Sequence, residues 1–319
     1  MKKVGILCGG KSAEHEISLL SANSIYEMID KTKFDPTLIK IEKTGQWQMD
    51  TVTKFDVIFP ILHGPFGEDG TIQGLLKLAD VPFVGSGVLG SAAGMDKDVM
   101  KRLLRDAQIP IGKFITLKSH EPRPSFVEIE SALGAPFFVK PANMGSSVGI
   151  AKVRCEAEYT AALENAFLYD TKIIIEENID GREIECAILG NEEPLASVPC
   201  EIVPAHDFYS YEAKYLDEKG AALEVPAKLD EETKKRVQEL AVKVFLILCC
   251  EGISRVDFFL KANGELIVNE INTMPGFSKI SMYPKMWEAS GFSYTELITR
   301  LIELAIQRHE KELRLKTSF

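Results

Sequence analysis

Residues 255–276 read RVDFFLKANGELIVNEINTMPG, and the rest of the chain is best understood around this stretch. Two runs of apolar, β-branched and aromatic residues flank Asn263-Gly264. This dipeptide readily adopts positive φ, so it favours a two-residue type I′ turn between antiparallel strands. The stretch therefore predicts a β-hairpin, and a two-residue loop sets its register.

The predicted register places two acids face to face. Asp257 lies opposite Glu270, and directly opposed residues have Cβ atoms about 5 Å apart, so like charges destabilise the pair unless a cation lies between them. Arg255 lies opposite Asn272, and all four side chains share one face because side chains alternate along a strand. Oxygen ligands without His or Cys favour Mg²⁺ or Mn²⁺, and Mg²⁺ commonly takes phosphate oxygens as well. The pattern predicts a metal and nucleotide site on Asp257, Glu270 and Asn272; the alternative is an exposed hairpin with solvated acids.

Length and composition are those of a multidomain soluble enzyme. The chain has 319 residues, so two or three domains are expected. Its formal charge of −10, from 37 basic and 47 acidic residues, argues against a nonspecific nucleic-acid binder. No apolar run is long enough to span a bilayer, and the six cysteines show no C-x-x-C spacing. We expect a cytoplasmic protein with reduced thiols that binds neither nucleic acid nor membrane.

The first segment predicts a strand, a turn and a helix. Residues 4–7 form an apolar run, Gly9-Gly10 predicts a tight turn, and Ser12 is a candidate N-cap of the helix. Glu14 falls in the first helical turn, where the helix dipole alone explains a carboxylate. However, residues 9–14 also follow a strand at its carboxyl end, which is where open α/β sheets bind ligands.

A second loop at the same expected sheet edge carries a histidine. The apolar run at 55–62 ends in HGPFGEDG at 63–70, whose glycines and proline predict an ordered loop. A lone histidine is commonly structural, but the position of His63 at a strand end also fits substrate binding.

Residues 137–150, FFVKPANMGSSVGI, predict a strand, a turn of small residues and another strand. Backbone N–H groups around Ser146 and Ser147 can bind phosphate oxygens while Lys140 supplies a positive charge. A plain hairpin tip is the alternative, although a lysine that emerges from Phe-Phe-Val is costly to bury without an anionic partner.

Two further segments could bind the adenosine part of a nucleotide. Residues 172–177 predict a buried strand that turns into a second strand at 182, and backbone groups at such a step can bind adenine. Glu183 lies close enough in sequence to bind ribose hydroxyls, and Phe259 with Val268 offers an apolar surface for the base. Residues 207–215, DFYSYEAKY, predict a lid or Ω-loop.

In this order the motifs resemble those of the D-alanine–D-alanine ligases of the ATP-grasp superfamily, along essentially the whole chain. The matching motifs are GGKSAEHEIS (9–18), HGPFGEDG (63–70), MDK (95–97), KPANMGSSVG (140–149), YEAKY (211–215), RVD (255–257) and NEINTMPG (269–276). The resemblance implies an α/β, three-domain ATP-grasp architecture: an N-terminal open α/β domain (1–95) and two α+β subdomains (96–179 and 180–319) that clasp ATP. It implies ATP-dependent joining of two D-alanines for peptidoglycan, through an acyl phosphate that the second amine attacks.

The resemblance also implies roles for single residues. The phosphates would be neutralised by Lys97, Lys140 and Lys214, with two Mg²⁺ or Mn²⁺ ions on Asp257, Glu270 and Asn272. The rest of the ATP site would consist of Ser147, Glu176, Glu177, Ile179, Glu183 and Phe259. The substrates would be bound by Glu14, His63, Tyr209, Ser281 and the Met282 N–H. Arg255 and the Gly276 N–H would stabilise the oxyanion. Ser146 and Tyr215 would form a hydrogen-bonded triad with Glu14 that closes the lid against water.

Specificity and alternatives follow from the same comparison. Family members that make D-alanyl-D-lactate commonly replace the lid tyrosine, so Tyr215 indicates D-alanine as the second substrate. Asn143-Met144 lacks a charged pair and Asn178 an aromatic that some relatives carry at the nucleotide. The alternatives are another ATP-grasp carboxylate–amine ligase with a different amino- or hydroxy-acid acceptor, and an ATP-binding regulatory protein without turnover. Because the family is often dimeric, a homodimer is expected.

Overall fold

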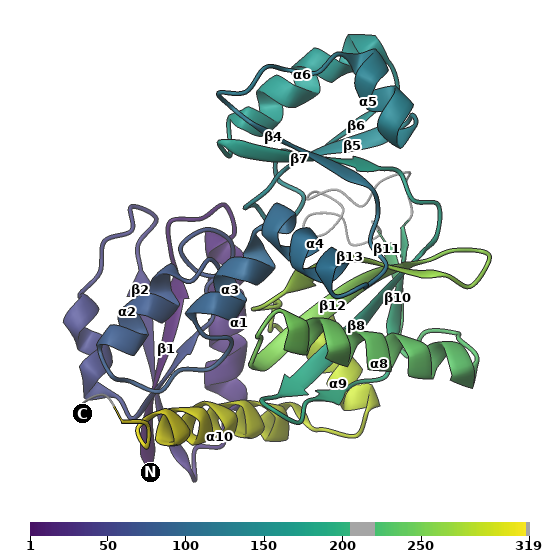
Figure 1. Cartoon of the computed structure of the whole chain (residues 1–319). Coiled ribbons are helices and arrows are strands. Elements are labelled where there is room, and N and C mark those ends of the chain that lie inside the picture. Colours follow the sequence, from purple (N-terminus) through teal and green to yellow (C-terminus); the bar gives the residue numbers. More distant parts are fainter. Residues whose placement is uncertain (205–220, 317–319) are drawn as a thin grey trace.

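The computed structural model describes residues 1–204 and 221–316, which form three β-sheets with helices packed on them (Figure 1). The N-terminal sheet is parallel, in the order β2-β1-β3. Its elements are β1 (Lys2–Gly9), α1 (His15–Met28), β2 (Phe34–Ile41), η1 (Met49–Lys54), β3 (Val57–Pro60), α2 (Thr71–Leu78) and α3 (Val88–Met95). The predicted N-cap Ser12 is wrong, because α1 begins at His15 with Glu14 as N-cap, and Ser12 Oγ instead accepts a hydrogen bond from Glu14 N.

The central sheet is antiparallel, in the order β4-β7-β5-β6, and stands apart from the other two at the top of Figure 1. Helix α4 (Lys97–Asp106) leads into it. Its elements are β4 (Phe114–Lys118), α5 (Phe126–Leu133), β5 (Phe137–Pro141), β6 (Ala151–Val153), α6 (Glu156–Phe167) and β7 (Lys172–Glu177). It has a hydrophobic core of its own, in which Phe126, Phe137 and Tyr159 pack edge to face or tilted.

The C-terminal sheet runs β11-β10-β8-β12-β13, with β9 paired to β8. Its strands are β8 (Arg182–Gly190), β9 (Leu195–Ala196), β10 (Cys200–Pro204), β11 (Ala221–Glu224), β12 (Gly252–Leu260) and β13 (Leu266–Asn272). The helices are α8 (Glu231–Ile247), α9 (Met282–Ala289) and α10 (Tyr294–Glu312). Val237, Ala241 and Val244 recur at helical spacing on α8 and bury that face against the sheet.

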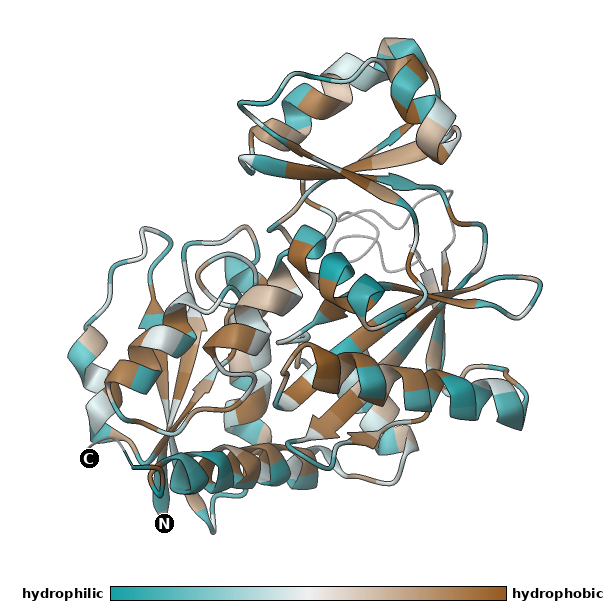
Figure 2. Cartoon of the chain, viewed as in Figure 1, coloured by the Kyte–Doolittle hydropathy of each residue, from teal (hydrophilic) through white to brown (hydrophobic). Residues whose placement is uncertain are grey.

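Helix α10 joins the N-terminal and C-terminal sheets into one core. A capping box of Ser293 and Glu296 starts the helix. Its apolar residues, among them Leu297 and Leu301, pack in one cluster with Val4 of β1 and Leu189 of β8. Figure 2 shows the matching pattern, with hydrophobic and hydrophilic residues interleaved along α10. In the described ranges no helix combines the length and apolar character needed to cross a membrane.

Candidate active site

The β12–β13 hairpin places acid opposite acid, as the sequence predicts. Asp257 pairs with Glu270, and Arg255 pairs with Asn272. Asp257 is buried, so the alternative of a solvated, exposed acidic face does not hold for this residue.

The predicted two-residue loop of this hairpin is wrong. Lys261 N donates to Glu265 O and Gly264 N donates to Lys261 O, which leaves a three-residue loop with Gly264 at φ +82°. This loop shifts the pairing by one residue, so Phe259 pairs with Ile267. A β-bulge between Asp257 and Phe258 shifts it back. The two irregularities cancel, and the acidic pair keeps the predicted alignment.

Arg255 joins two carboxylates on this face. Its Nε and Nη2 donate to the two oxygens of Asp257, each at 2.7 Å, and Nε lies 3.2 Å from Oε2 of Glu185. Glu185 also pairs with Asp257 in the β8–β12 register. Burial lowers the pKa of Arg255, but the two acids outweigh burial and raise this pKa well above its usual value.

The predicted metal ligands fit a hard divalent cation in their chemistry. Asp257, Glu270 and Asn272 supply only oxygen donors on one face of the hairpin. Glu270 Oε2 lies 3.5 Å from Lys97 Nζ, and Asn272 Oδ1 accepts a hydrogen bond from Met274 N at 3.1 Å. Two of these three donors are carboxylates and the third is an amide. Within residues 1–204 and 221–316, no group of three or more His, Cys, Asp or Glu is arranged to hold a metal.

A cavity of about 450 Å³ lies between the central and C-terminal sheets. This volume is in the range of small-molecule and cofactor sites. The predicted residues that line it are Lys97, Lys140, Ser146, Ser147, Glu176, Glu177, Ile179, Glu183, Phe259 and Glu270. Residues expected to bind phosphates and residues expected to bind adenosine therefore share one cavity, and Glu270 connects it to the acidic face of the hairpin.

Glu176 is buried in this cavity between two lysines. Lys101 Nζ lies 2.9 Å from its Oε1, and Lys140 Nζ lies 2.5 Å from its Oε2. Burial raises the pKa of Glu176, but the two lysines more than offset it and bring the pKa to about 2. Lys140 therefore has an anionic partner within the chain, which explains how it is buried.

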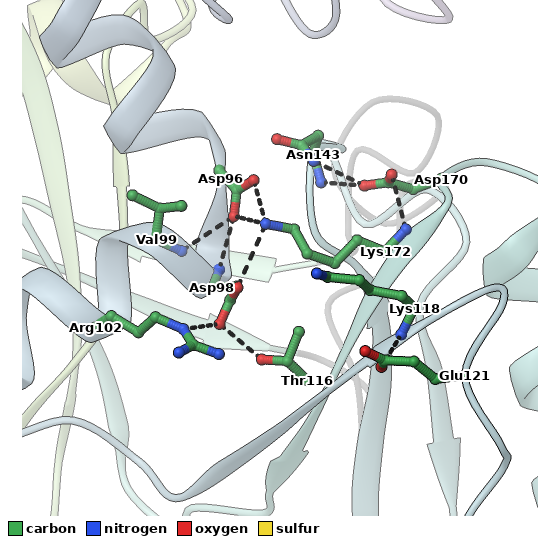
Figure 3. Close-up of polar contacts among 10 residues, drawn as sticks. All are labelled: Asp96, Asp98, Val99, Arg102, Thr116, Lys118, Glu121, Asn143, Asp170 and Lys172. Carbon is green, nitrogen blue, oxygen red and sulfur yellow. Dashed lines mark hydrogen bonds and ion pairs between the residues drawn. The ribbon is translucent and has the colours of Figure 1, made fainter.

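The start of α4 is tied to the central sheet by an ion-pair network (Figure 3). Lys172 Nζ of β7 lies 2.7 and 2.5 Å from the two oxygens of Asp96, and 3.4 Å from Oδ2 of Asp98. Asp96 also caps α4, and Asp98 accepts from the Thr116 hydroxyl of β4 at 2.7 Å. The helix that carries Lys97 is thus held to two strands of the central sheet.

The loop after β5 is held by two residues outside it, Asp170 and Lys97. Asn143 N and Nδ2 both donate to Oδ2 of Asp170, at 2.8 and 3.0 Å (Figure 3). Lys97 N donates to Ala142 O, and Lys97 Nζ donates to Met144 O at 2.7 Å. These bonds place the following Gly-Ser-Ser turn over the cavity.

Glu14 is the point where three loops meet. Its Oε1 accepts a hydrogen bond from Ser146 Oγ. A Cβ added to Gly64 would lie 3.0 Å from Glu14 Oε2, and one added to Gly145 would lie 3.4 Å away. Glycine at position 64 lets the loop 63–70 approach this carboxylate closely, whereas a Cβ on Gly145 would meet it at an ordinary contact distance.

His63 lies near Glu14 as a neutral hydrogen-bond donor. Its Nδ1 lies 2.9 Å from the carbonyl oxygen of Met274, which can only accept, so Nδ1 carries the proton. Burial lowers the pKa of His63. The Nε2 atom is buried, and it has no hydrogen-bond partner among the described residues.

Gly276, Ser281 and Met282 lie close together at the start of α9. Ser281 is the residue before this helix, and Met282 is its first residue. The Ser281 Oγ accepts from Ser278 N at 3.0 Å, and a Cβ on Gly276 would lie 3.1 Å from that Oγ. The predicted site residues Tyr209, Lys214 and Tyr215 lie outside the described residues.

Sequence reasoning missed three buried side chains near the site. Lys101 lies one helical turn after Lys97 on α4, and this i, i+4 spacing was a usable signal. Glu185 lies two residues after Glu183 on β8, so their side chains point to the same face of the strand, and this spacing was also a usable signal. Glu68 contacts the backbone at Met274, 206 residues away, and no local pattern predicts such a contact.

Comparisons with known protein families cover nearly the whole chain. The family model described as "D-ala D-ala ligase C-terminus" matches residues 103–303. The model described as "D-ala D-ala ligase N-terminus" matches residues 3–54 and 48–86. The chain is 50% identical to D-alanine--D-alanine ligase of Shouchella clausii, over 99% of this chain and 98% of that protein. It is 49% identical to D-alanine--D-alanine ligase A of Escherichia coli K12, over 99% of both chains.

Three solved structures are similar over almost their full length. The D-alanine-D-alanine ligase from Coxiella burnetii has a TM-score of 0.88 and 37% identity, over 98% of this chain and 96% of that one. The VanG D-Ala:D-Ser ligase from Enterococcus faecalis has a TM-score of 0.87 and 38% identity, over 95% and 99%. The Bacillus anthracis D-alanine--D-alanine ligase complexed with ATP has a TM-score of 0.84 and 30% identity, over 98% and 100%.

Proposed function

The chain belongs to the D-alanine–D-alanine ligase family, and we propose that the residues gathered at Glu14, the cavity and the β12–β13 hairpin carry out the reaction of this family. Its fold is the ATP-grasp fold. The enzyme uses ATP to join two D-alanines into D-alanyl-D-alanine for peptidoglycan synthesis.

One observation supports this site assignment most strongly. Glu270 lines the cavity that contains the lysines, and it is also directly opposed to Asp257 on the hairpin. Because Glu270 belongs to both the cavity and the hairpin, its carboxylate would hold the phosphates of ATP beside the acceptor substrate. Phosphoryl transfer depends mainly on such positioning and on charge stabilisation.

In the proposed mechanism, a carboxylate oxygen of the first D-alanine attacks the terminal phosphorus of ATP, and ADP leaves. The amine of the second D-alanine then attacks the acyl carbon, and phosphate leaves as the amide bond forms. Glu14 binds the ammonium of the first D-alanine, and Ser281 with the Met282 N–H binds the carboxylate of the second. Arg255 and the Gly276 N–H stabilise the oxyanion between them.

The ATP site is proposed to hold two Mg²⁺ or Mn²⁺ ions on Asp257, Glu270 and Asn272. Such ions, when bound, would neutralise charge on the transferring phosphate. Lys97, Lys140 and Lys214 are proposed to contact the phosphates. Adenosine is proposed to lie against Glu176, Glu183, Phe259 and the backbone of residues 177–179, with Ser147 at the phosphate turn.

Several further assignments are proposals of the same kind. Ser146, Tyr215 and Glu14 would close the lid, and His63 and Tyr209 would complete the substrate pocket. The division into 1–95, 96–179 and 180–319 is supported by the three sheets, one in each range. All six cysteines are free thiols, which supports a cytoplasmic location. A homodimer is proposed from family membership, and sedimentation at working concentration would test it.

The substrate assignment is tested by measuring phosphate release and dipeptide formation with ATP and each acceptor in turn. D-alanine should give both products in equal amounts, whereas L-alanine and D-lactate should give little of either. D-serine belongs in the test because one similar structure is a D-Ala:D-Ser ligase. A clear preference for D-serine or D-lactate would identify another carboxylate ligase, and nucleotide binding without D-alanine-dependent release would identify a regulatory protein.

A further inference from the structure

Glu68 is a buried acid that the proposed mechanism does not use. It lies in the loop 63–70 with 7% of its surface exposed. Its Oε2 accepts a hydrogen bond from Gly64 N at 2.7 Å, and its Oε1 accepts one from Met274 N at 3.2 Å. One carboxylate therefore connects the loop beside Glu14 to the loop that follows β13.

The peptide groups of Met274 are held from both sides by the same N-terminal loop. The Met274 carbonyl accepts from His63 Nδ1, and the Met274 N–H is shared between Glu68 Oε1 and Asn272 Oδ1. Met274 lies midway between Asn272 and Gly276, two residues from each. A shift at Met274 would thus move a proposed metal ligand and the proposed oxyanion donor together.

The electrostatic setting makes Glu68 an expensive residue for packing alone. Burial and the nearby Glu14 raise the pKa of Glu68 to about 8, against the two N–H groups that stabilise its charge. Burying a second acid beside Glu14 costs free energy that an apolar residue would not. An apolar side chain, however, could not accept from both backbone N–H groups.

We propose that Glu68 is a positioning residue that holds the Met274 peptide in place against the loop 63–70 beside Glu14. In this way it also fixes the positions of Asn272 and Gly276. The inference rests on the proposed function, because it assumes that Gly276 and Asn272 take part in the reaction. Glu68 itself touches neither substrate nor ATP in this assignment. It acts by fixing the distance between the first-substrate site and the oxyanion site.

Glu68→Gln tests the proposal at constant size. The amide can accept from one of the two N–H groups but presents an NH₂ to the other, so one link is lost. Glu251→Gln is the matched control, since Glu251 also joins distant parts of the chain, through Arg308 of α10, away from the site. Both variants would be measured for thermal stability, equilibrium ADP binding, kcat, KM for D-alanine and for ATP, and dipeptide formed per phosphate released.

For Glu68→Gln we expect kcat to fall about 10- to 100-fold, as is typical when a residue that positions a functional group is lost. We also expect fewer than one molecule of dipeptide to form for each phosphate released. ADP binding and KM for ATP should stay within about twofold, and Glu251→Gln should keep wild-type kinetics. Glu68→Asp keeps the carboxyl group but is one methylene too short for both contacts, so it should show the same split and serves if the glutamine variant does not fold. Wild-type kcat and coupling in either variant, or an equal loss in Glu251→Gln, would overturn the inference. Failure of the wild-type enzyme to ligate D-alanine would instead overturn the proposed function.

Discussion

The hydroxyl of Ser146 donates a hydrogen bond to Oε1 of Glu14, a residue 132 positions earlier in the chain. Ser146 belongs to the unit built on the central sheet, and Glu14 occupies the N-cap position of the first helix of the N-terminal unit. Ser146 and Ser147 have φ of 51° and 61°, a left-handed conformation that costs non-glycine residues about 1–2 kcal/mol each. The turn keeps this conformation where it contacts Glu14, so the contact connects the central unit to the proposed first-substrate site.

Replacing Ser146 should therefore impair use of D-alanine. Ser146→Ala removes a hydrogen bond to a carboxylate, worth about 1.5–3 kcal/mol, which corresponds to a roughly 10- to 150-fold lower kcat/KM for D-alanine. Steady-state kinetics with D-alanine as the varied substrate measures this. Ser125→Ala is the control, because it removes a helix cap in the same unit and should lower stability by about 1 kcal/mol without a kinetic effect. Equal kinetics in the two variants would contradict the coupling.

Lys172 should be needed to hold the central unit to α4. Lys172→Met leaves Asp96 and Asp98 without their shared cation, and breaking a buried ion pair costs about 3–5 kcal/mol. Because the Lys172 side chain is 17% exposed, we expect the lower end of this range. Urea unfolding measures the effect. Lys118→Met is the matched control, since Lys118 pairs with Lys172 across β4–β7 but is exposed (Figure 3). A similar loss in both variants would show that the ion pair contributes little.

The hairpin shows which structural features the sequence predicts and which it does not. The register set by a two-residue loop predicts that Asp257 faces Glu270, and this pairing is confirmed. The turn dipeptide, however, suggested a two-residue loop, and the structure has three residues there and a compensating bulge. Loop length and bulges depend on twist and on packing against neighbouring strands, which a local pattern does not contain.

Long-range polar contacts are the part that local patterns cannot supply. The pairing of Glu176 with Lys101 and Lys140 requires α4, β5 and β7 to be placed in space, and only Glu176 and Lys140 were singled out from the sequence. The link from Glu68 to Met274 depends on the loop 63–70 reaching the end of β13. The charge and the expected burial of a single residue can indicate that it lies near a site. They do not indicate which distant residue it contacts.

Asp257 should control the metal dependence of the reaction. Both oxygens of Asp257 accept hydrogen bonds from Arg255, so a cation on this carboxylate would compete with the guanidinium. Asp257→Asn should lower kcat at least about 100-fold and raise the Mg²⁺ concentration for half-maximal activity, because a proposed carboxylate ligand of the metal is lost. A Mg²⁺ titration of activity and of ADP binding measures this. Asp230→Asn, at the N-cap of α8 where Asn is equally suitable, should leave the titration unchanged. An unshifted titration in Asp257→Asn would remove this residue from the metal site.

Glu176 should make the stability of the protein fall in acid. Its folded pKa of about 2 lies below its usual value of 4.5, so between these values the unfolded chain binds more protons than the folded one. The stabilisation is therefore complete above about pH 4.5 and is lost as the pH falls toward 2, with a magnitude on the order of 3 kcal/mol. Urea unfolding from pH 7 to pH 3 measures the slope. Glu176→Gln should flatten it and lower stability at pH 7, because Lys101 and Lys140 then lie buried without their acid. Adding Lys101→Met to Glu176→Gln should recover part of that loss, since one uncompensated charge is removed. If the single variant keeps the wild-type slope below pH 5, the acid response comes from other carboxylates, and Glu176 is not held in its ionised form by the two lysines.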